Sequence, residues 1–337
     1  MSGSGGCGEP GVRGAVDAGG HLDQHPYEHR PVMVDEVVEL FAAVPAGVVV
    51  DATVGGGGHA AALLVAHAQL QVVGLDRDAE AIAAARVTLA GFGSRATLFR
   101  ARFDHLAEVA RSAGAGAAVS GVLFDLGVSS VQLDRADRGF SYRFDAPLDM
   151  RMDQDADLTA ATVVNTAPVE ELARLFADSG ERRLARRIAE AVVAARPLSS
   201  TGQLAEVVAR AVPAPARRRG HPARRVFQAV RIAVNDELAV LEAALPDALD
   251  LLCQGGRCVV ISYHSGEDRL VKAVFTDAAT GGCHCPPGLP CVCGAVPTVR
   301  LLNRGARRPK LGEVQANPRA GSARLRACER LGEQGDG

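Results

Sequence analysis

Short apolar runs alternate with stretches of helical composition through the first half of the chain. The apolar runs cover 48–50, 71–75, 96–99 and 121–124, and the helical stretches cover 60–68, 79–89 and 104–112. Three of the runs close on an aspartate, namely Asp51, Asp76 and Asp125. Alternation of this kind predicts an α/β fold, in which helices cover both faces of a doubly wound, Rossmann-like parallel sheet.

After residue 134 the pattern predicts helices alone, over 159–178, 181–195, 200–212 and 222–245, with Ser200 or Thr201 as N-cap of the third. An apolar run at 257–262 then follows Gly255 and Gly256 and predicts a fifth strand. The simplest organisation is one Rossmann-like domain, 25–135 with 226–330, interrupted by an all-helical insertion at 136–225. Residues 1–24 are rich in Gly and lack apolar periodicity, which predicts a disordered tail.

Composition supports a folded chain. The 337 residues are 47% hydrophobic and 23% charged, close to the globular average. The sequence shows neither a long uncharged apolar stretch nor the apolar core of a signal peptide, so we expect a cytoplasmic protein with no membrane partner.

Charge is balanced overall but unevenly placed. The chain has 37 basic and 39 acidic residues, yet arginines gather between 181 and 231 and again between 300 and 330. Such clusters can form a positive surface for the phosphates of a nucleic acid, or they can be solvated helix faces. Charge alone does not choose between these alternatives.

A glycine cluster, Gly55 to Gly58, lies between the first predicted strand and helix. Open parallel sheets bind ligands at this edge, so a cofactor loop is a better interpretation than a flexible turn. Asp76 closes the next strand and could accept the two hydroxyl hydrogens of an adenosine ribose, or cap a helix. Both NAD and S-adenosyl-L-methionine carry that ribose, so the pattern leaves the cofactor open.

Asp125 closes the fourth strand and would face the same cleft, unless it only caps the next turn. Adenosylmethionine-dependent amino methyltransferases place an acidic or amide side chain there, facing the acceptor nitrogen. Several longer blocks then recur in order: Asp51-Ala52-Thr53, Gly57-Gly58-His59, Asp125-Leu126-Gly127-Val128-Ser129-Ser130-Val131-Gln132-Leu133-Asp134, Arg138-Gly139-Phe140, Pro147-Leu148-Asp149-Met150-Arg151-Met152-Asp153, Phe227-Gln228-Ala229-Val230-Arg231-Ile232, His264-Ser265 and Glu267-Asp268-Arg269.

From about 26 to 330 the chain resembles the bacterial family of small-subunit (16S) ribosomal RNA cytosine-N4 methyltransferases. The resemblance implies methylation of a cytidine N4 in the decoding region, with 16S rRNA or the small ribosomal subunit as partner. It also implies an adenosylmethionine site formed by Gly57, Gly58, His59, Asp76, Phe103, Asp125 and Gln132. Two departures from the family pattern are Gly266, usually Leu, and Gly321, usually Arg. The second could remove a phosphate contact.

The amine of cytosine is a poor nucleophile because its lone pair is delocalised into the ring. An acceptor for the amine hydrogens would localise that lone pair, and Asp125 or a backbone carbonyl in 126–129 is our candidate. The predicted catalytic residues are Asp125, Asp149 and His264, with Asp153 and Glu267 as further polar candidates. The rival functions are an NAD-dependent oxidoreductase and a non-catalytic rRNA-binding or ribosome-assembly protein.

Two further features remain open. Arg224, Gln228, Arg231 and Asn235 fall at helical spacing beside an apolar stripe, and we predict RNA contacts there rather than a merely solvated face. Cys283, Cys285, Cys291 and Cys293, with His284, could hold a structural zinc or lie in an unmetallated surface loop. Disulfides are disfavoured in a reducing cytoplasm.

Overall fold

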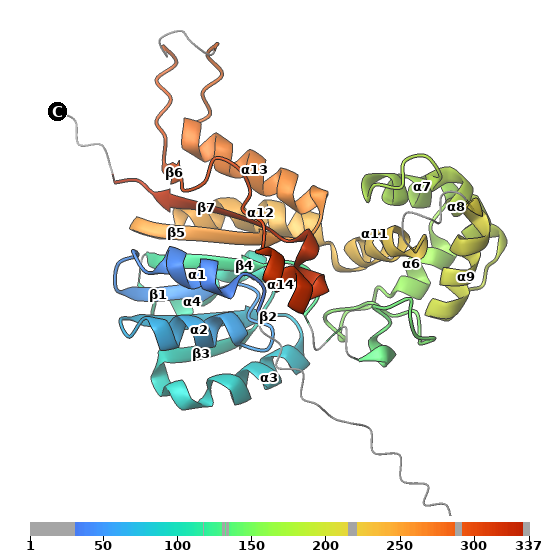
Figure 1. Cartoon of the computed structure of the whole chain (residues 1–337), viewed down its shortest axis with the longest axis horizontal. Helices are drawn as coiled ribbons and strands as arrows, with labels where there is room; N and C mark the ends of the chain where they lie inside the picture. The colour runs from blue at the N-terminus through green and yellow to red at the C-terminus, as the bar shows by residue number, and fades with distance from the viewer. Residues whose placement is uncertain are drawn as a thin grey trace, which may run out of the picture.

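The computed structural model describes residues 31–116, 118–129, 132, 135–214, 221–286 and 292–332. The predicted tail at 1–24 and the candidate ligand Cys291 lie outside the described residues. Within them, the chain forms a sheet lobe and a smaller lobe of helices (Figure 1).

The described strands form one sheet in the order β3-β2-β1-β4-β5-β7-β6. Their bounds are β1 Gly47–Asp51, β2 Leu70–Asp76, β3 Ala96–Arg100, β4 Val119–Asp125, β5 Leu252–Ser262, β6 Val299–Leu301 and β7 Arg324–Arg330. Strands β1 to β5 pair in parallel, whereas β7 runs antiparallel to both β5 and β6. The Rossmann-like α/β prediction is therefore confirmed, with five parallel strands as expected.

Strands β6 and β7 lie in the segment that the sequence marked only as basic. Leu325 and Ala327 of β7 are buried, while Arg324 and Arg326 beside them point to the other face and pair with Asp268, each at 2.8 Å. Apolar and charged residues already alternate over 324–327 in the sequence, as in a strand, whereas charge alone left these arginines open to a positive surface or a solvated helix face. These two arginines instead hold β7 against the helix that follows β5.

Helices cover both faces of the sheet. In the sheet lobe they are α1 Val34–Phe41, α2 Gly58–Ala66, α3 Ala79–Leu89, α4 Leu106–Ser112, α12 Glu237–Asp250, α13 Ser265–Thr280 and α14 Leu311–Ala316. Buried side chains of α1, α2 and α3 pack on one face, and those of α4, α12 and α13 pack on the other. No helix among the described residues has both the length and the apolar character needed to span a bilayer.

The helical lobe is inserted between β4 and β5 and has its own apolar core. Its helices are α6 Ala160–Thr166, α7 Val169–Asp178, α8 Ala185–Ala194, α9 Thr201–Ala211 and α11 Ala223–Asn235. Helix α11 straddles the predicted boundary at 225/226, and its buried Val226, Phe227 and Val230 belong to the core of this lobe. The predicted domain limits stay a prediction.

Two predicted helices are interrupted. The helix expected over 159–178 divides at Pro168, because the residue before a proline is forced out of the helical region. The helix expected over 222–245 divides at Asp236, whose φ of 50° is left-handed. The guanidinium of Arg77 donates to the carbonyl of Asn235 at 2.9 and 2.6 Å and so satisfies an oxygen at the end of α11. This break turns the chain back into the sheet lobe.

Candidate active site

One cavity of about 680 Å³ lies where the two lobes meet. It opens at the carboxyl ends of β1, β2 and β4, beneath the exposed side of α11 and beside the start of α13. The predicted site residues that line it are Gly58, His59, Asp76, Phe103, Asp125, Gln132, Arg224, Gln228, Arg231, Asn235 and His264. Ligand sites of open α/β sheets lie at this edge, so topology brings together residues far apart in sequence.

The glycine loop shapes the cavity wall next to β1. Gly55 has a φ of +51° and donates its N–H to Asp76 Oδ2 at 3.1 Å. Gly56 lines the cavity, and a Cβ added there would meet no atom within 4 Å. Gly57, predicted to bind cofactor, instead faces α3: its Cβ would lie 3.2 Å from the Leu89 side chain. The open approach for a ligand is therefore at Gly56.

Two aspartates lie beside this loop, Asp51 buried and Asp76 half-buried. Burial raises the pKa of Asp76 to about 6, although its carboxylate accepts N–H groups from Asp78 and Gly55. Burial also raises the pKa of Asp51 to about 7, and its Oδ2 has no hydrogen-bond partner in the described structure. Each carboxylate is costly to ionise in isolation, so a bound cation would stabilise its charged form.

Asp125 is held by residues from three segments. Tyr263 donates its hydroxyl to Asp125 Oδ1 at 2.8 Å, and His59 Nδ1 lies 3.5 Å from Oδ2. The backbone N–H of Asp125 donates to Thr53 Oγ1 at 2.6 Å. Burial, with the neighbouring Asp125 charge, raises the pKa of Tyr263 well above its ordinary value, so Tyr263 stays a hydrogen-bond donor.

His264 caps helix α13. Its Nδ1 accepts the backbone N–H groups of Gly266 at 3.1 Å and Glu267 at 3.3 Å, so the ring hydrogen belongs on Nε2. Nε2 lies 3.1 Å from Glu267 Oε1, and the other carboxylate oxygen accepts from the N–H groups of Tyr263 and His264. Neither ring nitrogen offers a free lone pair in this arrangement. Its geometry is that of a helix cap at the cavity wall.

The predicted RNA stripe on α11 is divided between two environments. Arg224 is exposed and Gln228 half-buried, and both line the cavity. Arg231 instead forms two hydrogen bonds with the Glu237 carboxylate, both 2.8 Å long. Asn235 is buried, accepts from Met152 N–H and donates to Met150 carbonyl oxygen. Arg224 and Gln228 are therefore accessible to a ligand in the cavity, whereas Arg231 and Asn235 hold α11 in place through contacts with Glu237, Met150 and Met152.

Several predicted residues lie at the periphery or outside the cavity. Asp149 is not among the described residues that line it, and its carboxylate pairs with Arg151 at 2.7 Å. Asp153, also absent from the described lining, pairs with Arg100 at 2.6 Å. Phe103 lines the cavity and packs edge-on against Phe124, with the ring centroids 5.7 Å apart. Of the predicted carboxylates, Asp76, Asp125 and Glu267 line the cavity, and the catalytic roles stay predictions.

Sequence reasoning missed the role of Arg138. This side chain is 1% exposed and donates to Asp78, to Glu80 and to the carbonyls of Arg151 and Met152. Gln132 donates to the same Asp78 carboxylate at 2.9 Å. The network ties the end of β2 to the segment entering the helical lobe. A single arginine beside a glycine gave no local signal for this.

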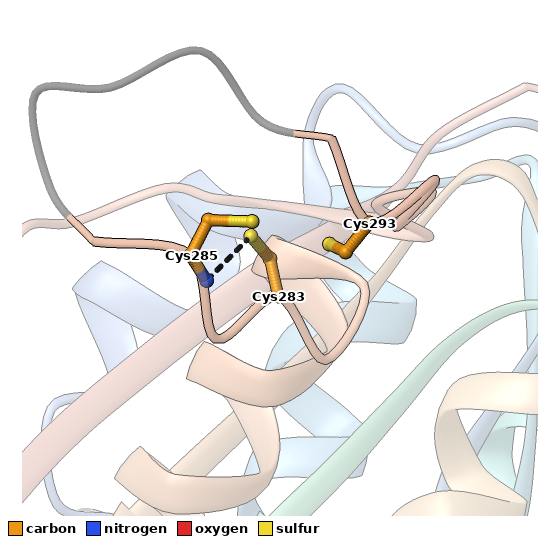
Figure 2. A group of neighbouring side chains, drawn as sticks. All are labelled: Cys283, Cys285 and Cys293. Carbon is orange, nitrogen blue, oxygen red and sulfur yellow. Dashed lines mark hydrogen bonds between the residues drawn. The ribbon is translucent and has the colours of Figure 1, made fainter.

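Three cysteines converge at the far end of α13. The sulfur atoms of Cys283, Cys285 and Cys293 lie within 4.8 Å of one another, and the N–H of Cys285 donates to Cys283 Sγ at 3.4 Å (Figure 2). His284 is exposed and is not part of this group. Within the described residues, these three are the predicted metal candidates that meet.

The sequence profile of the MraW methylase family matches residues 26–331 of the chain. The protein belongs to the MraW methylase family. Proteins called ribosomal RNA small subunit methyltransferase H are close relatives. The one from Heliobacterium modesticaldum is 50% identical, covering 90% of this chain and 99% of the relative. The one from Symbiobacterium thermophilum is 52% identical and covers 90% of this chain and 97% of the relative. The one from Salinispora arenicola is 54% identical and covers 90% of this chain and 83% of the relative.

Among solved structures, a putative rRNA methylase from Clostridium thermocellum superposes with a TM-score of 0.41 and 15% identity, covering 90% of this chain and 98% of that one. This superposition is too loose to bear on the site. Family membership and the cavity at the strand ends are the two independent findings that concern function. Membership of a methylase family argues against the alternative of an NAD-dependent oxidoreductase.

Proposed function

We propose that this protein transfers a methyl group from S-adenosyl-L-methionine to the N4 atom of a cytidine in the decoding region of 16S rRNA. The observation that carries the proposal is the position of Asp125. It lies at the end of β4, in the same cavity as the glycine loop and the outward residues of α11. Methyl transfer requires that donor and acceptor bind side by side, so their two pockets must adjoin.

The cavity fits the proposed donor. Its volume of about 680 Å³ lies within the usual range for sites of small molecules and cofactors. Gly56 leaves open space for close approach of a ligand to the backbone, and Phe103 offers an apolar ring for a base. Adenosylmethionine supplies a methyl group activated by a positively charged sulfonium. The carboxylates of Asp51, Asp76 and Asp125 favour a cation in this region.

The reaction asks this chain to orient an amine rather than to supply a strong base. Asp125 can accept a hydrogen bond from an N–H of the cytosine amine, which turns the nitrogen lone pair towards the methyl carbon as charge develops. Holding the two reacting atoms about 3 to 3.5 Å apart lowers the barrier by several kcal/mol. Tyr263 fixes the carboxylate for this task through the hydrogen bond to Oδ1, and the His59 ring packs beside Oδ2.

The RNA partner is proposed to approach over α11. Arg224 and Gln228 face the cavity mouth, where a phosphate or base edge of a splayed nucleotide would lie. The arginines elsewhere on the helical lobe are partly neutralised, since Arg186, Arg210 and Arg225 pair with glutamates. A small-subunit rRNA substrate would place the enzyme in the cytoplasm.

The decisive experiment is methyl transfer to small subunits isolated from a strain that lacks this protein. Radiolabelled adenosylmethionine should label those subunits but not subunits from the parent strain, and mass mapping should find N4-methylcytidine in the decoding region. Naked 16S rRNA serves as a second substrate. Binding of the subunits without any label would support the assembly-protein alternative and reject the enzymatic one.

A further inference from the structure

We propose that Cys283, Cys285 and Cys293 bind a structural Zn²⁺ ion, which closes the loop between α13 and β6. The three thiols come from both arms of this loop. Cys283 and Cys285 lie on the arm that follows α13, and Cys293, eight residues after Cys285, lies on the arm that leads to β6. Figure 2 shows the three side chains directed at one another. Neither the family nor the cavity at the strand ends accounts for this convergence.

The distances suit a tetrahedral thiolate site. Zinc bound to sulfur at about 2.3 Å in a tetrahedron places its sulfur ligands about 3.8 Å apart. The three sulfur atoms already lie within 4.8 Å of one another, so small side-chain rotations bring them to that spacing. Binding deprotonates the thiols and releases their protons to solvent. The N–H of Cys285, which donates to Cys283 Sγ, stabilises the resulting thiolate.

The described part of the loop has no apolar core of its own. Val292 and Val296 are 89% and 59% exposed, so these side chains do not pack the two arms together. The base of the loop is fixed: Gly281 ends α13 with a φ of +63°, and Thr298 donates its N–H to Ala278 carbonyl oxygen at 2.9 Å. A cross-link stabilises one conformation of an exposed segment that has no core, and a metal ion held by both arms would supply it.

The other described cysteines have a different character. Cys258 and Cys328 face each other across β5 and β7, and burial raises the pKa of both thiols. Cys253 is half-buried, and burial raises its pKa as well. These thiols are kept neutral and separate from the cluster. Cys253 therefore offers a matched control for a serine substitution.

The proposed ion lies far from the cavity. Helix α13 begins beside His264 at the cavity wall and ends sixteen residues later, before Cys283. At 1.5 Å per residue the helix separates the two ends by about 24 Å. The metal is thus structural, and its removal should loosen the loop without changing the reacting groups. This separates the proposal from the methyltransferase activity.

Metal analysis of the full chain tests the proposal directly. Protein purified under reducing conditions, without added metal or chelator, should contain one equivalent of zinc per chain. The single variants Cys283→Ser and Cys293→Ser should lose it, while Cys253→Ser should keep it; Cys291→Ser is included to identify a fourth ligand. Substoichiometric zinc in the parent, zinc retained by a Cys283, Cys285 and Cys293 triple variant, or a disulfide within the cluster would overturn the proposal.

A second measurement does not depend on how the variants fold. Titration of a thiol-modifying reagent into the parent protein, followed with a chromogenic zinc chelator, should release zinc as the cluster is modified. Limited proteolysis should then cut the loop between α13 and β6 faster, while the affinity for adenosylmethionine stays unchanged. Modification of the cluster without zinc release would contradict the assignment.

Discussion

His59 Nδ1 faces Asp125 Oδ2 at 3.5 Å, while His59 Nε2 lies 2.9 Å from the carbonyl oxygen of Val32. A carbonyl can only accept, so Nε2 carries a hydrogen. A hydrogen on Nδ1 as well would be donated to the carboxylate, whereas a bare Nδ1 would face it as a second acceptor, a conflict that a cationic ligand would relieve. This arrangement makes the Asp125 carboxylate responsive to a cationic ligand nearby.

Replacing Asp125 with asparagine should separate folding from turnover. The amide oxygen can still accept from Tyr263, and the amide nitrogen would donate to His59 Nδ1, so the variant should fold as well as the parent. Turnover should fall about a hundredfold or more if the carboxylate orients the amine. Single-turnover methyl transfer and equilibrium adenosylmethionine titration measure the two properties. Near-normal turnover would remove this role from Asp125.

Adjacent glycines should respond differently to alanine. Gly56→Ala adds a methyl group at the cavity wall and should weaken adenosylmethionine binding with little change in stability. Gly57→Ala, at a φ of +86° and 3.2 Å from Leu89, should lower the free energy of unfolding by about 1–3 kcal/mol. Urea denaturation and ligand titration on both variants check this. If the two variants changed ligand binding and stability to the same extent, the placement of Gly56 at the cavity and of Gly57 against α3 would be contradicted.

Asp51→Asn should change the pH dependence of stability. The pKa of Asp51 is about 7 in the folded protein against an ordinary 3.8, so the parent loses stability as pH rises from 4 to 7. The variant lacks this loss, and its unfolding free energy relative to the parent should grow by about 3 kcal/mol over that range. Denaturation curves of both proteins at several pH values test this prediction. Effects of the substitution that do not depend on pH shift the free-energy difference by a constant and do not change its slope with pH. Parallel pH profiles would show that Asp51 does not titrate this way.

Charge reversal on α11 should have different effects at the exposed Arg224 and at Arg231, which pairs with Glu237. Arg224→Glu should weaken rRNA binding and flatten its dependence on log salt concentration by about one charge, because Arg224 is exposed at the cavity mouth. Arg231→Glu should instead lower the unfolding temperature, because it would leave Glu237 facing another carboxylate. Filter binding at several salt concentrations and thermal denaturation provide the readouts. An unchanged salt slope for Arg224→Glu would exclude that residue from the interface.

Arg138→Met should be strongly destabilising. The substitution leaves Asp78 buried without its cation and removes the link to the carbonyls of Arg151 and Met152, at a cost of about 3–5 kcal/mol. Arg135→Met provides the control, because Arg135 is exposed and pairs with Asp137 and Glu80 on the surface. Denaturant midpoints compare the two variants. Similar midpoints would mean that the buried network contributes little.

The sequence determined the sheet and the general position of the site. Buried strands of a parallel sheet are continuous apolar runs, and three of the runs here end on an aspartate where the chain must turn. The pattern alone therefore assigns Asp76 and Asp125 to one edge of the sheet. The Ser200 N-cap was equally local, since its side chain accepts from the N–H of Gln203 three residues on.

Only the tertiary structure decided which of the polar residues along the cavity make structural contacts. Arg231 and Asn235 share the helical spacing of Arg224, yet contacts with Glu237 and Met150 turn them to structural use. Arg138 meets Asp78 sixty residues away, and the three cysteines meet across a loop. Periodicity records whether a position is buried, because burial repeats with the helix or strand. It carries no record of a partner distant in sequence, so those contacts appear only when the chain is folded.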